Sequence, residues 1–279
     1  MRYLAFFLIV CLWSCSYNDK TIKVKGSDTE VNLAVNLAEQ FYKINRSFSV
    51  SISGGGSGLG IASLLNGQAD IANSSRPLND EEDSLFRAKG IVLRTIVFAE
   101  DATAFVVRND FPLDSIDVET LGNVLSGKYT NWKPVTGIDM PINIYGRQSN
   151  SGTHSFVSKK LKIEFSPAAK EMNGNAQILQ GVRMDVSGIG YVGAGYLLHT
   201  GSQAGQVKVL KIKEKANMPG VSPLDETAIK AGRYYFQRPL YQFIPARSWN
   251  KVSAFIAFEQ STLGQQLITA SGYYIVKQN

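Results

Sequence analysis

The sequence "TIKVKGSDTEVNLAVNLAEQF", residues 21–41, joins a predicted strand, a polar turn and a predicted helix. Residues 21–26 have the β-branched composition of a short strand, and the apolar residues between Val31 and Phe41 recur at the spacing of one helix face. A second strand is predicted at residues 47–53. A strand, a helix and a strand in this order predict an α/β fold, in which helices cover both faces of a sheet.

The rest of the chain continues this alternation. A helix is predicted at residues 81–89, because acidic residues stand at its start and Gly90 follows it. A long helix is predicted at residues 248–261. Further strands are predicted at residues 91–98, 104–107, 142–145, 189–192 and 207–212.

The chain is long enough for two modest domains, yet no repeat or low-complexity linker separates them. We therefore expect two lobes joined by hinge strands that cross between them, with residues 102–108 and 238–246 as the candidate crossings. The first lobe is then formed by residues 21–107 and 238–279, and the second lobe by residues 108–237.

The N-terminus is typical of an exported lipoprotein. Arg2 precedes an apolar run over residues 4–13 that is too short to span a bilayer and is typical of a signal peptide. Cys15 follows Ser14 as in a bacterial lipoprotein box, so we expect residues 1–14 to be removed, Cys15 to be lipidated and residues 15–20 to form a tether. The alternative is a plain signal peptide in which Cys15 is incidental. Cys11 is the only other cysteine, so the processed chain has no disulfide to form.

The formal net charge of +6 favours an anionic partner. The basic residues are scattered along the chain and form no stripe of the kind that binds nucleic acid. We therefore expect no nucleic-acid partner.

Four polar, glycine-rich turns follow predicted strands and point to an anion site. They lie at residues 26–30, 53–60, 73–78 and 146–153, and three of them open a predicted helix. A helix N-terminus presents unpaired backbone N–H groups, and glycine lets the backbone approach a ligand closely. Arg147 adds a planar guanidinium suited to two oxygens of a tetrahedral oxyanion. Arg76 is a second candidate, with a surface ion pair as the alternative.

Three other kinds of site do not fit the sequence. Residues 122–129, "GNVLSGKY", resemble a nucleotide phosphate loop, but Tyr129 replaces the required Ser or Thr and the preceding residues are typical of a helix. Ser151 and His154 lack the third group and the nucleophile elbow of a serine hydrolase. Only one other histidine, His199, is present, and no cysteine pair or carboxylate–histidine cluster predicts a metal site. We expect no catalytic residue and no cofactor.

The order of these motifs resembles a known family. The chain contains GSDTEVNLA, then SGGGSGLGIASLLNGQADIANSSRPL, VLSGKYTNW, GRQSNSGTHSF, VSGIGYVGAGY and RPLYQF. In this order they resemble the phosphate-binding lipoproteins of bacterial phosphate ABC transporters, within the type II periplasmic-binding-protein superfamily. The resemblance implies two lobes that close over one dehydrated inorganic phosphate and deliver it to the transporter's permease.

The resemblance also implies the site residues, position by position. Some relatives have an aspartate in place of Ser75, which accepts the proton of hydrogen phosphate, so the choice between phosphate and sulfate stays open and Asp28 or Glu30 is the candidate acceptor. The implied phosphate contacts are Ser27, Asp28, Thr29, Ser57, Ser75, Arg76, Arg147, Ser151, Gly152 and Thr153.

The expected protein is a monomer in the cell envelope, held outside the cytoplasm by its lipid. Three alternatives stay open: a binding protein for sulfate, molybdate or tungstate, a phosphate sensor or scavenger without a permease, and an enzyme on the same scaffold that uses Ser151.

Overall fold

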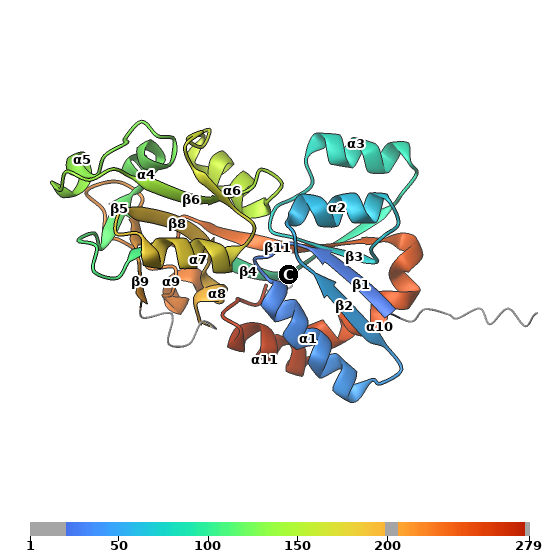
Figure 1. Ribbon diagram of the computed structural model, residues 1–279. Helices are drawn as coiled ribbons and strands as arrows, with labels where there is room; N and C mark the ends of the chain where they lie inside the picture. The colour runs from blue at the N-terminus through green and yellow to red at the C-terminus, as the bar shows by residue number, and fades with distance from the viewer. Residues whose placement is uncertain (1–20, 199–205, 277–279) are drawn as a thin grey trace, which may run out of the picture.

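The structure is a computed structural model that describes residues 21–198 and 206–276, and it has two lobes (Figure 1). The predicted signal peptide, the lipidation site at Cys15, the tether and His199 lie outside the described residues. Within the described ranges, no helix is long and apolar enough to cross a membrane.

The first lobe contains the N-terminal strand–helix units and the C-terminal helices. Three parallel strands are joined by helices, with β1 between β2 and β3, and β11 runs antiparallel to β3. Helices α1 and α10 pack on one face of this sheet, and α2 and α3 pack on the other, so both faces are covered as expected. The elements are β1 (Thr21–Gly26), α1 (Val31–Ile44), β2 (Ser49–Ser53), α2 (Ser57–Leu65), β3 (Ile71–Ser74), α3 (Asp80–Ala88), β11 (Gln237–Pro245), η2 (Ala246–Ser248), α10 (Trp249–Gln260) and α11 (Thr262–Ala270).

The second lobe has its own apolar core, which includes Phe105, Trp132 and Tyr191. Strand β6 runs parallel to its neighbours β8 and β7, and β5 pairs with β10 in a separate two-stranded sheet. The elements are β5 (Ser115–Asp117), α4 (Val118–Leu125), α5 (Lys133–Thr136), β6 (Asn143–Arg147), α6 (Gly152–Leu161), β7 (Lys170–Met172), α7 (Asn175–Met184), β8 (Gly188–Gly193), α8 (Ala194–Leu198), β9 (Val207–Val209), β10 (Lys211–Lys213) and α9 (Glu226–Lys230).

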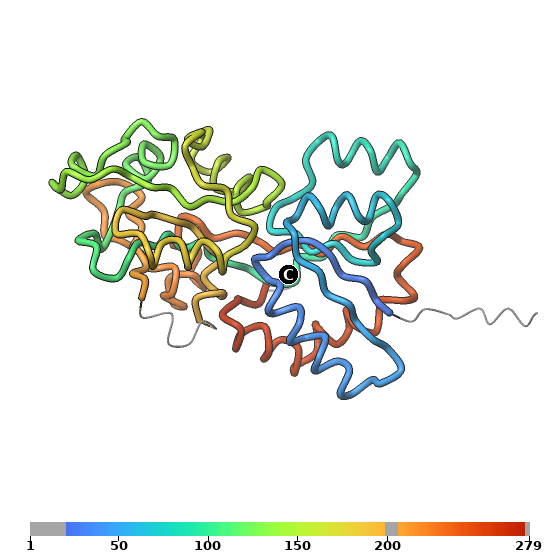
Figure 2. Tube along the Cα trace, viewed as in Figure 1, coloured from blue at the N-terminus to red at the C-terminus, as the bar shows by residue number. Residues whose placement is uncertain are grey.

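One long strand, β4 (Leu93–Arg108), belongs to both lobes. As far as Ala102 it pairs with β11, and from Thr103 onward it pairs with β8 of the second lobe. The chain returns next to this point, where Phe236 O accepts from Thr103 N at 3.0 Å and Gln237 pairs with Ala102. Figure 2 shows the two passages of the chain between the lobes, in green and in orange. The molecule is therefore a two-lobed α/β protein with hinge strands.

Two predictions about strands are corrected by the structure. The strands expected at residues 91–98 and 104–107 are parts of the single strand β4, because the polar pair Glu100–Asp101 continues the ladder with β11 instead of ending it. The strand expected at residues 207–212 is two strands, β9 and β10, in different sheets. The expected crossing at residues 238–246 lies within the first lobe, and the chain crosses just before it. The rejected nucleotide motif lies partly in α4, which ends at Leu125.

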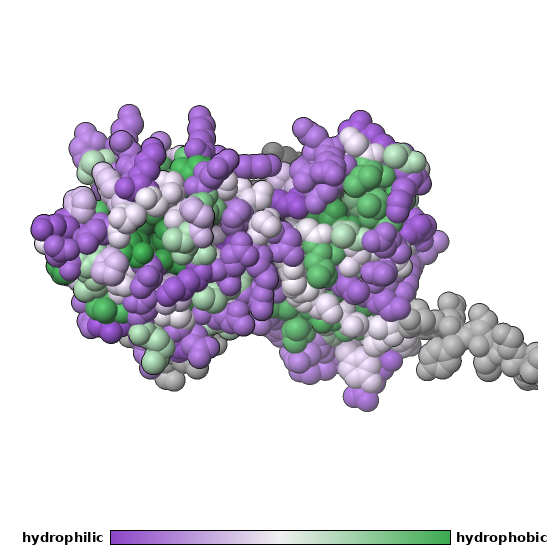
Figure 3. Space-filling model, turned by 45° about the horizontal axis from the view of Figure 1, so that its top comes forward, coloured by the Kyte–Doolittle hydropathy of each residue, from purple (hydrophilic) through white to green (hydrophobic). Residues whose placement is uncertain are grey.

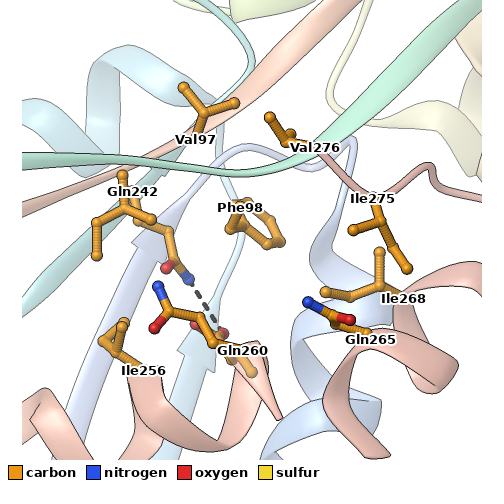
Figure 4. A pocket seen from close by; sticks show the side chains of 11 residues that line it. Val97, Phe98, Gln242, Ile256, Gln260, Gln265, Ile268, Ile275 and Val276 are labelled. Carbon is orange, nitrogen blue, oxygen red and sulfur yellow. Dashed lines mark hydrogen bonds between the residues drawn. The ribbon is translucent and has the colours of Figure 1, made fainter. Parts of the chain in front are cut away.

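A small cavity of about 30 Å³ lies in the first lobe under the C-terminal segment (Figure 4). The side chains of Ile256 and Ile268 line it, and Gln242 Nε2 donates to Glu259 Oε1 at 3.1 Å. This volume suits a single water molecule. Burial raises the pKa of Glu259 to about 8. The cavity shares no lining residue with the site described below.

Candidate functional site

Three turns of the first lobe meet at the carboxyl ends of β1, β2 and β3. Ser27 Oγ donates to Ser75 Oγ at 3.2 Å, and Ser57 Oγ lies 3.4 Å from Ser75 Oγ. Ser57 Oγ also accepts from Ser75 N at 3.1 Å. All three serines are buried. Parallel strands bring their carboxyl ends to one edge of a sheet, which is why turns distant in the sequence form one cluster of hydroxyl groups.

The fourth turn comes from the second lobe and closes on this cluster. A Cβ added at Gly152 would lie 2.3 Å from Ser57 Oγ and 2.4 Å from Ser75 Oγ, so only glycine allows α6 to begin this close to the serines. Thr153 Oγ1 lies 3.1 Å from Thr29 Oγ1. The N-termini of α2 and α6, one from each lobe, therefore begin on opposite sides of the same hydroxyl cluster.

Arg147 and Asp28 form an ion pair between the lobes. Arg147 Nη2 donates to Asp28 Oδ2 at 2.5 Å and to Asn173 O at 3.2 Å. Gly55 N donates to the other carboxylate oxygen of Asp28 at 2.9 Å. The Arg147 side chain is 1% exposed, and its Nε has no hydrogen-bond partner among the described residues. Asp28 does not cap α1, since the residue at that position is Glu30.

Arg238 also belongs to the cluster, although it is not among the site residues predicted from the sequence. Its Nε and Nη2 donate to Asp101 Oδ2 at 3.1 and 2.9 Å, and both side chains are buried. Its Nη2 also lies 3.2 Å from Thr29 Oγ1 and 3.1 Å from Thr153 Oγ1. The motif RPLYQF was interpreted as part of a hinge strand and as a family motif, and no ligand contact was predicted in it. An arginine near the start of a largely apolar strand was the available signal, because a buried guanidinium requires partners.

Arg76 directly follows Ser75, and its guanidinium is ion-paired with Glu82 while lying beside Gly58 in the first turn of α2. Its Nη1 and Nη2 each lie 2.7 Å from a carboxylate oxygen of Glu82. Glu82 also accepts from the backbone N–H of Asn79 in the capping box of α3. The alternative named from the sequence was a surface ion pair; the structure has an ion pair, but its two side chains are only 11% and 17% exposed.

Ser151 and His154 are not arranged as nucleophile and base. Ser151 Oγ accepts from the backbone N–H of His154 at 3.4 Å, which is a helix cap. The imidazole of His154 packs against the ring of Phe165, with ring centroids 4.5 Å apart. Burial lowers the pKa of His154 below its ordinary value.

The lobes are in contact around the cluster. Gly58 N donates to Asn150 O at 3.0 Å, and Asn150 Nδ2 donates to Gly55 O at 3.3 Å. Asn175, at the start of α7, donates to Asp28 O at 3.2 Å. Hydrophilic residues follow the boundary between the lobes on the face shown in Figure 3. The lobes are therefore in contact in this structure, and around the cluster they meet through polar groups.

The cluster suits a tetrahedral oxyanion. It combines two buried guanidinium groups, hydroxyl donors from both lobes and the N-termini of two helices. No group of three or more His, Cys, Asp and Glu side chains within residues 21–198 and 206–276 is arranged to hold a metal ion. The chemistry available here is the recognition of an anion by hydrogen bonds and charge.

The chain is similar to a known family and to proteins of known structure. The family described as "PBP superfamily domain" matches residues 16–262. The phosphate-binding protein PstS of Borreliella burgdorferi is 28% identical, over 95% of this chain and 94% of that protein. PstS of Staphylococcus aureus strain USA300 is 30% identical, over 85% of this chain and 72% of that protein. The crystal structure of an ABC-type phosphate transport receptor from Vibrio cholerae has a TM-score of 0.70 at 26% identity, covering 91% of this chain and 100% of that one.

Proposed function

Because the chain belongs to the PBP superfamily, and within it to the family of phosphate-binding proteins named PstS, we propose that it binds inorganic phosphate outside the cytoplasm and delivers it to an ABC permease. The relatives named above are phosphate-binding proteins and a phosphate transport receptor, not enzymes. The observation that carries the proposal for this chain is the interlobe cluster, in which Arg147 and Arg238 lie buried against hydroxyl groups of both lobes.

Phosphate binds, in this proposal, between the N-termini of α2 and α6. Arg147 offers its Nε, and Arg238 offers Nη2, which now lies near two threonine hydroxyls. A desolvated dianion gains from several charge-assisted hydrogen bonds at once. The proposed contacts are Ser27, Thr29, Ser57, Ser75, Arg147, Ser151, Gly152, Thr153 and Arg238, without Arg76.

Asp28 acts on phosphate through Arg147, and its carboxylate is also a candidate direct contact. Its two carboxylate oxygens accept from Arg147 Nη2 and from Gly55 N, so the guanidinium is held in one orientation. A guanidinium that is already oriented loses less conformational entropy when it binds the anion. The remaining lone pairs of the Asp28 carboxylate are the candidate acceptor for the proton of hydrogen phosphate, which sulfate does not have.

Access to the site requires a hinge motion. Two chain segments, β4 at residues 102–103 and residues 236–237, are where the chain passes between the lobes. Rotation at these two segments would separate Asn150 from Gly58 and Arg147 from Asp28, and phosphate would favour an arrangement in which groups of both lobes contact the anion instead of one another.

The remaining parts of the proposal concern the place of the protein in the cell. Lipidation of Cys15 would anchor the chain outside the cytoplasm, with residues 16–20 as the tether to β1. The permease would then take phosphate from a monomer when the lobes open.

Calorimetric titration of the purified protein tests the proposal. We expect phosphate to bind with one site per chain, and sulfate, molybdate and tungstate to bind far more weakly. If one of the other oxyanions binds more tightly than phosphate, that anion is the ligand and the assignment of phosphate is wrong. The absence of binding to any of these anions would refute the proposal.

A further inference from the structure

Glu30 is a fully buried carboxyl group at the candidate site, and the contacts described above do not use it. It directly follows Thr29 and stands at the N-cap position of α1, but its side chain does not cap the helix. Both of its carboxyl oxygens are buried and have no hydrogen-bond partner within the described part of the chain. Burying an ionised carboxyl group without a partner costs free energy, so the presence of Glu30 beside an anion site needs a physical explanation.

The charged and titratable groups around Glu30 come from three elements. Arg238 of β11 and Asp101 of β4 are close enough to act on its charge, and its charge acts on Tyr273 in the segment after α11. Tyr273 OH donates to Thr29 O at 2.5 Å, so this segment is packed against the turn that carries Glu30.

The buried charges of the cluster balance without Glu30. Arg147 pairs with Asp28, and Arg238 pairs with Asp101, which gives two positive and two negative groups. An ionised Glu30 would add a third carboxylate to a site that must take an anion, whereas a protonated Glu30 adds no charge. A protonated carboxyl group also has an O–H that can donate to an anion oxygen.

We propose that Glu30 is a neutral carboxylic acid in the phosphate-bound protein, and that phosphate binding takes up one proton at this side chain whenever the free protein has lost it. This inference rests on the proposed function, and it adds to that function a link between phosphate affinity and pH that resides in one residue of the chain.

The pKa of Glu30 places this link just above neutral pH. Burial raises the pKa to about 8, against the lowering effects of the nearby Ser27 hydroxyl and of Arg238. Below this pH the free protein holds the proton already. Above it, phosphate must displace an ionised state, so its affinity should fall progressively as the pH rises.

The test compares the unchanged protein with Glu30→Gln, which keeps the size of the side chain and removes its titration. Phosphate binding is measured by calorimetry at pH 6.5 and 8.5, in pairs of buffers with different ionisation enthalpies, which gives the number of protons taken up. Changes in the protonation of phosphate itself are common to both proteins and cancel in the difference. At pH 8.5 the unchanged protein should take up more protons than Glu30→Gln, up to one per phosphate bound, and at pH 6.5 the difference should be close to zero.

Equal proton uptake in the two proteins at pH 8.5, or a ratio of their phosphate affinities that stays constant from pH 7 to 9, would overturn the inference and leave phosphate binding intact. An unchanged protein that binds no phosphate at any pH would overturn the proposed function instead. If Glu30→Gln does not fold, the infrared difference spectrum of the unchanged protein at pH 9, phosphate-bound minus free, decides. A new carboxylic-acid C=O band supports the proposal, and its absence refutes it.

Discussion

Replacing Arg147 by alanine should remove most of the affinity for phosphate. In the structure Arg147 Nη2 is engaged by Asp28 and by Asn173 O, and Nε is buried with no partner in the described chain. Arg147 therefore supplies a donor to the ligand, and its loss also leaves the Asp28 carboxylate, 16% exposed, facing the anion unpaired. Removal of one member of a buried, hydrogen-bonded charge pair costs about 2–5 kcal/mol, which corresponds to roughly a 30- to 5,000-fold rise in the dissociation constant.

Two further variants sharpen this test. Arg147→Lys keeps the charge, but an ammonium cannot hold Asp28 and the anion in one plane, so we expect it to restore only part of the lost affinity. Arg76→Ala is the matched control, because it removes an arginine of the same positive charge whose guanidinium is already paired with Glu82. We expect Arg76→Ala to bind within threefold of the unchanged protein.

The assay is calorimetric titration with phosphate, and thermal unfolding without ligand establishes that each variant is folded. A folded Arg147→Ala variant that binds phosphate within threefold of the unchanged protein would refute the assignment of Arg147. A loss in Arg76→Ala as large as that in Arg147→Ala would show that the ion pair with Glu82 does not describe the role of Arg76.

Three other changes have expected outcomes. Cys15→Ser should leave unprocessed precursor or a released soluble form, because acyl chains contribute about 0.8 kcal/mol per buried methylene to membrane binding; unchanged fractionation and mass would contradict lipidation. Asp28→Asn should weaken phosphate binding and admit sulfate, as calorimetry with both anions would show; an unchanged preference would exclude Asp28 as the proton acceptor. Glu259→Gln should become more stable relative to the unchanged protein as the pH rises from 5 to 8. The carboxyl of Glu259 ionises near 4.5 in the unfolded chain and near 8 in the folded one, so the unchanged protein loses stability over this range and the variant does not. The raised pKa of Glu259 limits this effect to about 5 kcal/mol, and free energies of unfolding in urea that do not diverge would contradict the buried acid.

The polar turns could be recognised from the sequence because their signals are local. In the GSDTE motif the glycine, the hydroxyl residues and the start of α1 lie within a few residues of one another, and Ser151 to Thr153 form a similar start of α6. The rule that parallel strands end at one edge then brings the turns together. The ion pair of Arg76 was also within reach, since the spacing of Asn79 and Glu82 is that of a capping box.

The parts of the site that the sequence did not predict depend on partners far along the chain. Asp101 and Arg238 are 137 residues apart, and their contact explains both a continuous β4 and a second buried arginine. Asp101 alone reads as a polar residue that ends a strand, and Arg238 alone reads as a surface charge. Only the sheet order, in which β11 lies beside β4, shows that each compensates the burial of the other.

A crystal structure of the protein grown with phosphate tests the central claim most directly. The account predicts one tetrahedral anion between the N-termini of α2 and α6, with Arg147 and Arg238 within hydrogen-bond distance of its oxygens and Arg76 still paired with Glu82. A phosphate bound elsewhere, or closed lobes with phosphate at saturating concentration and no anion at this cluster, would contradict it.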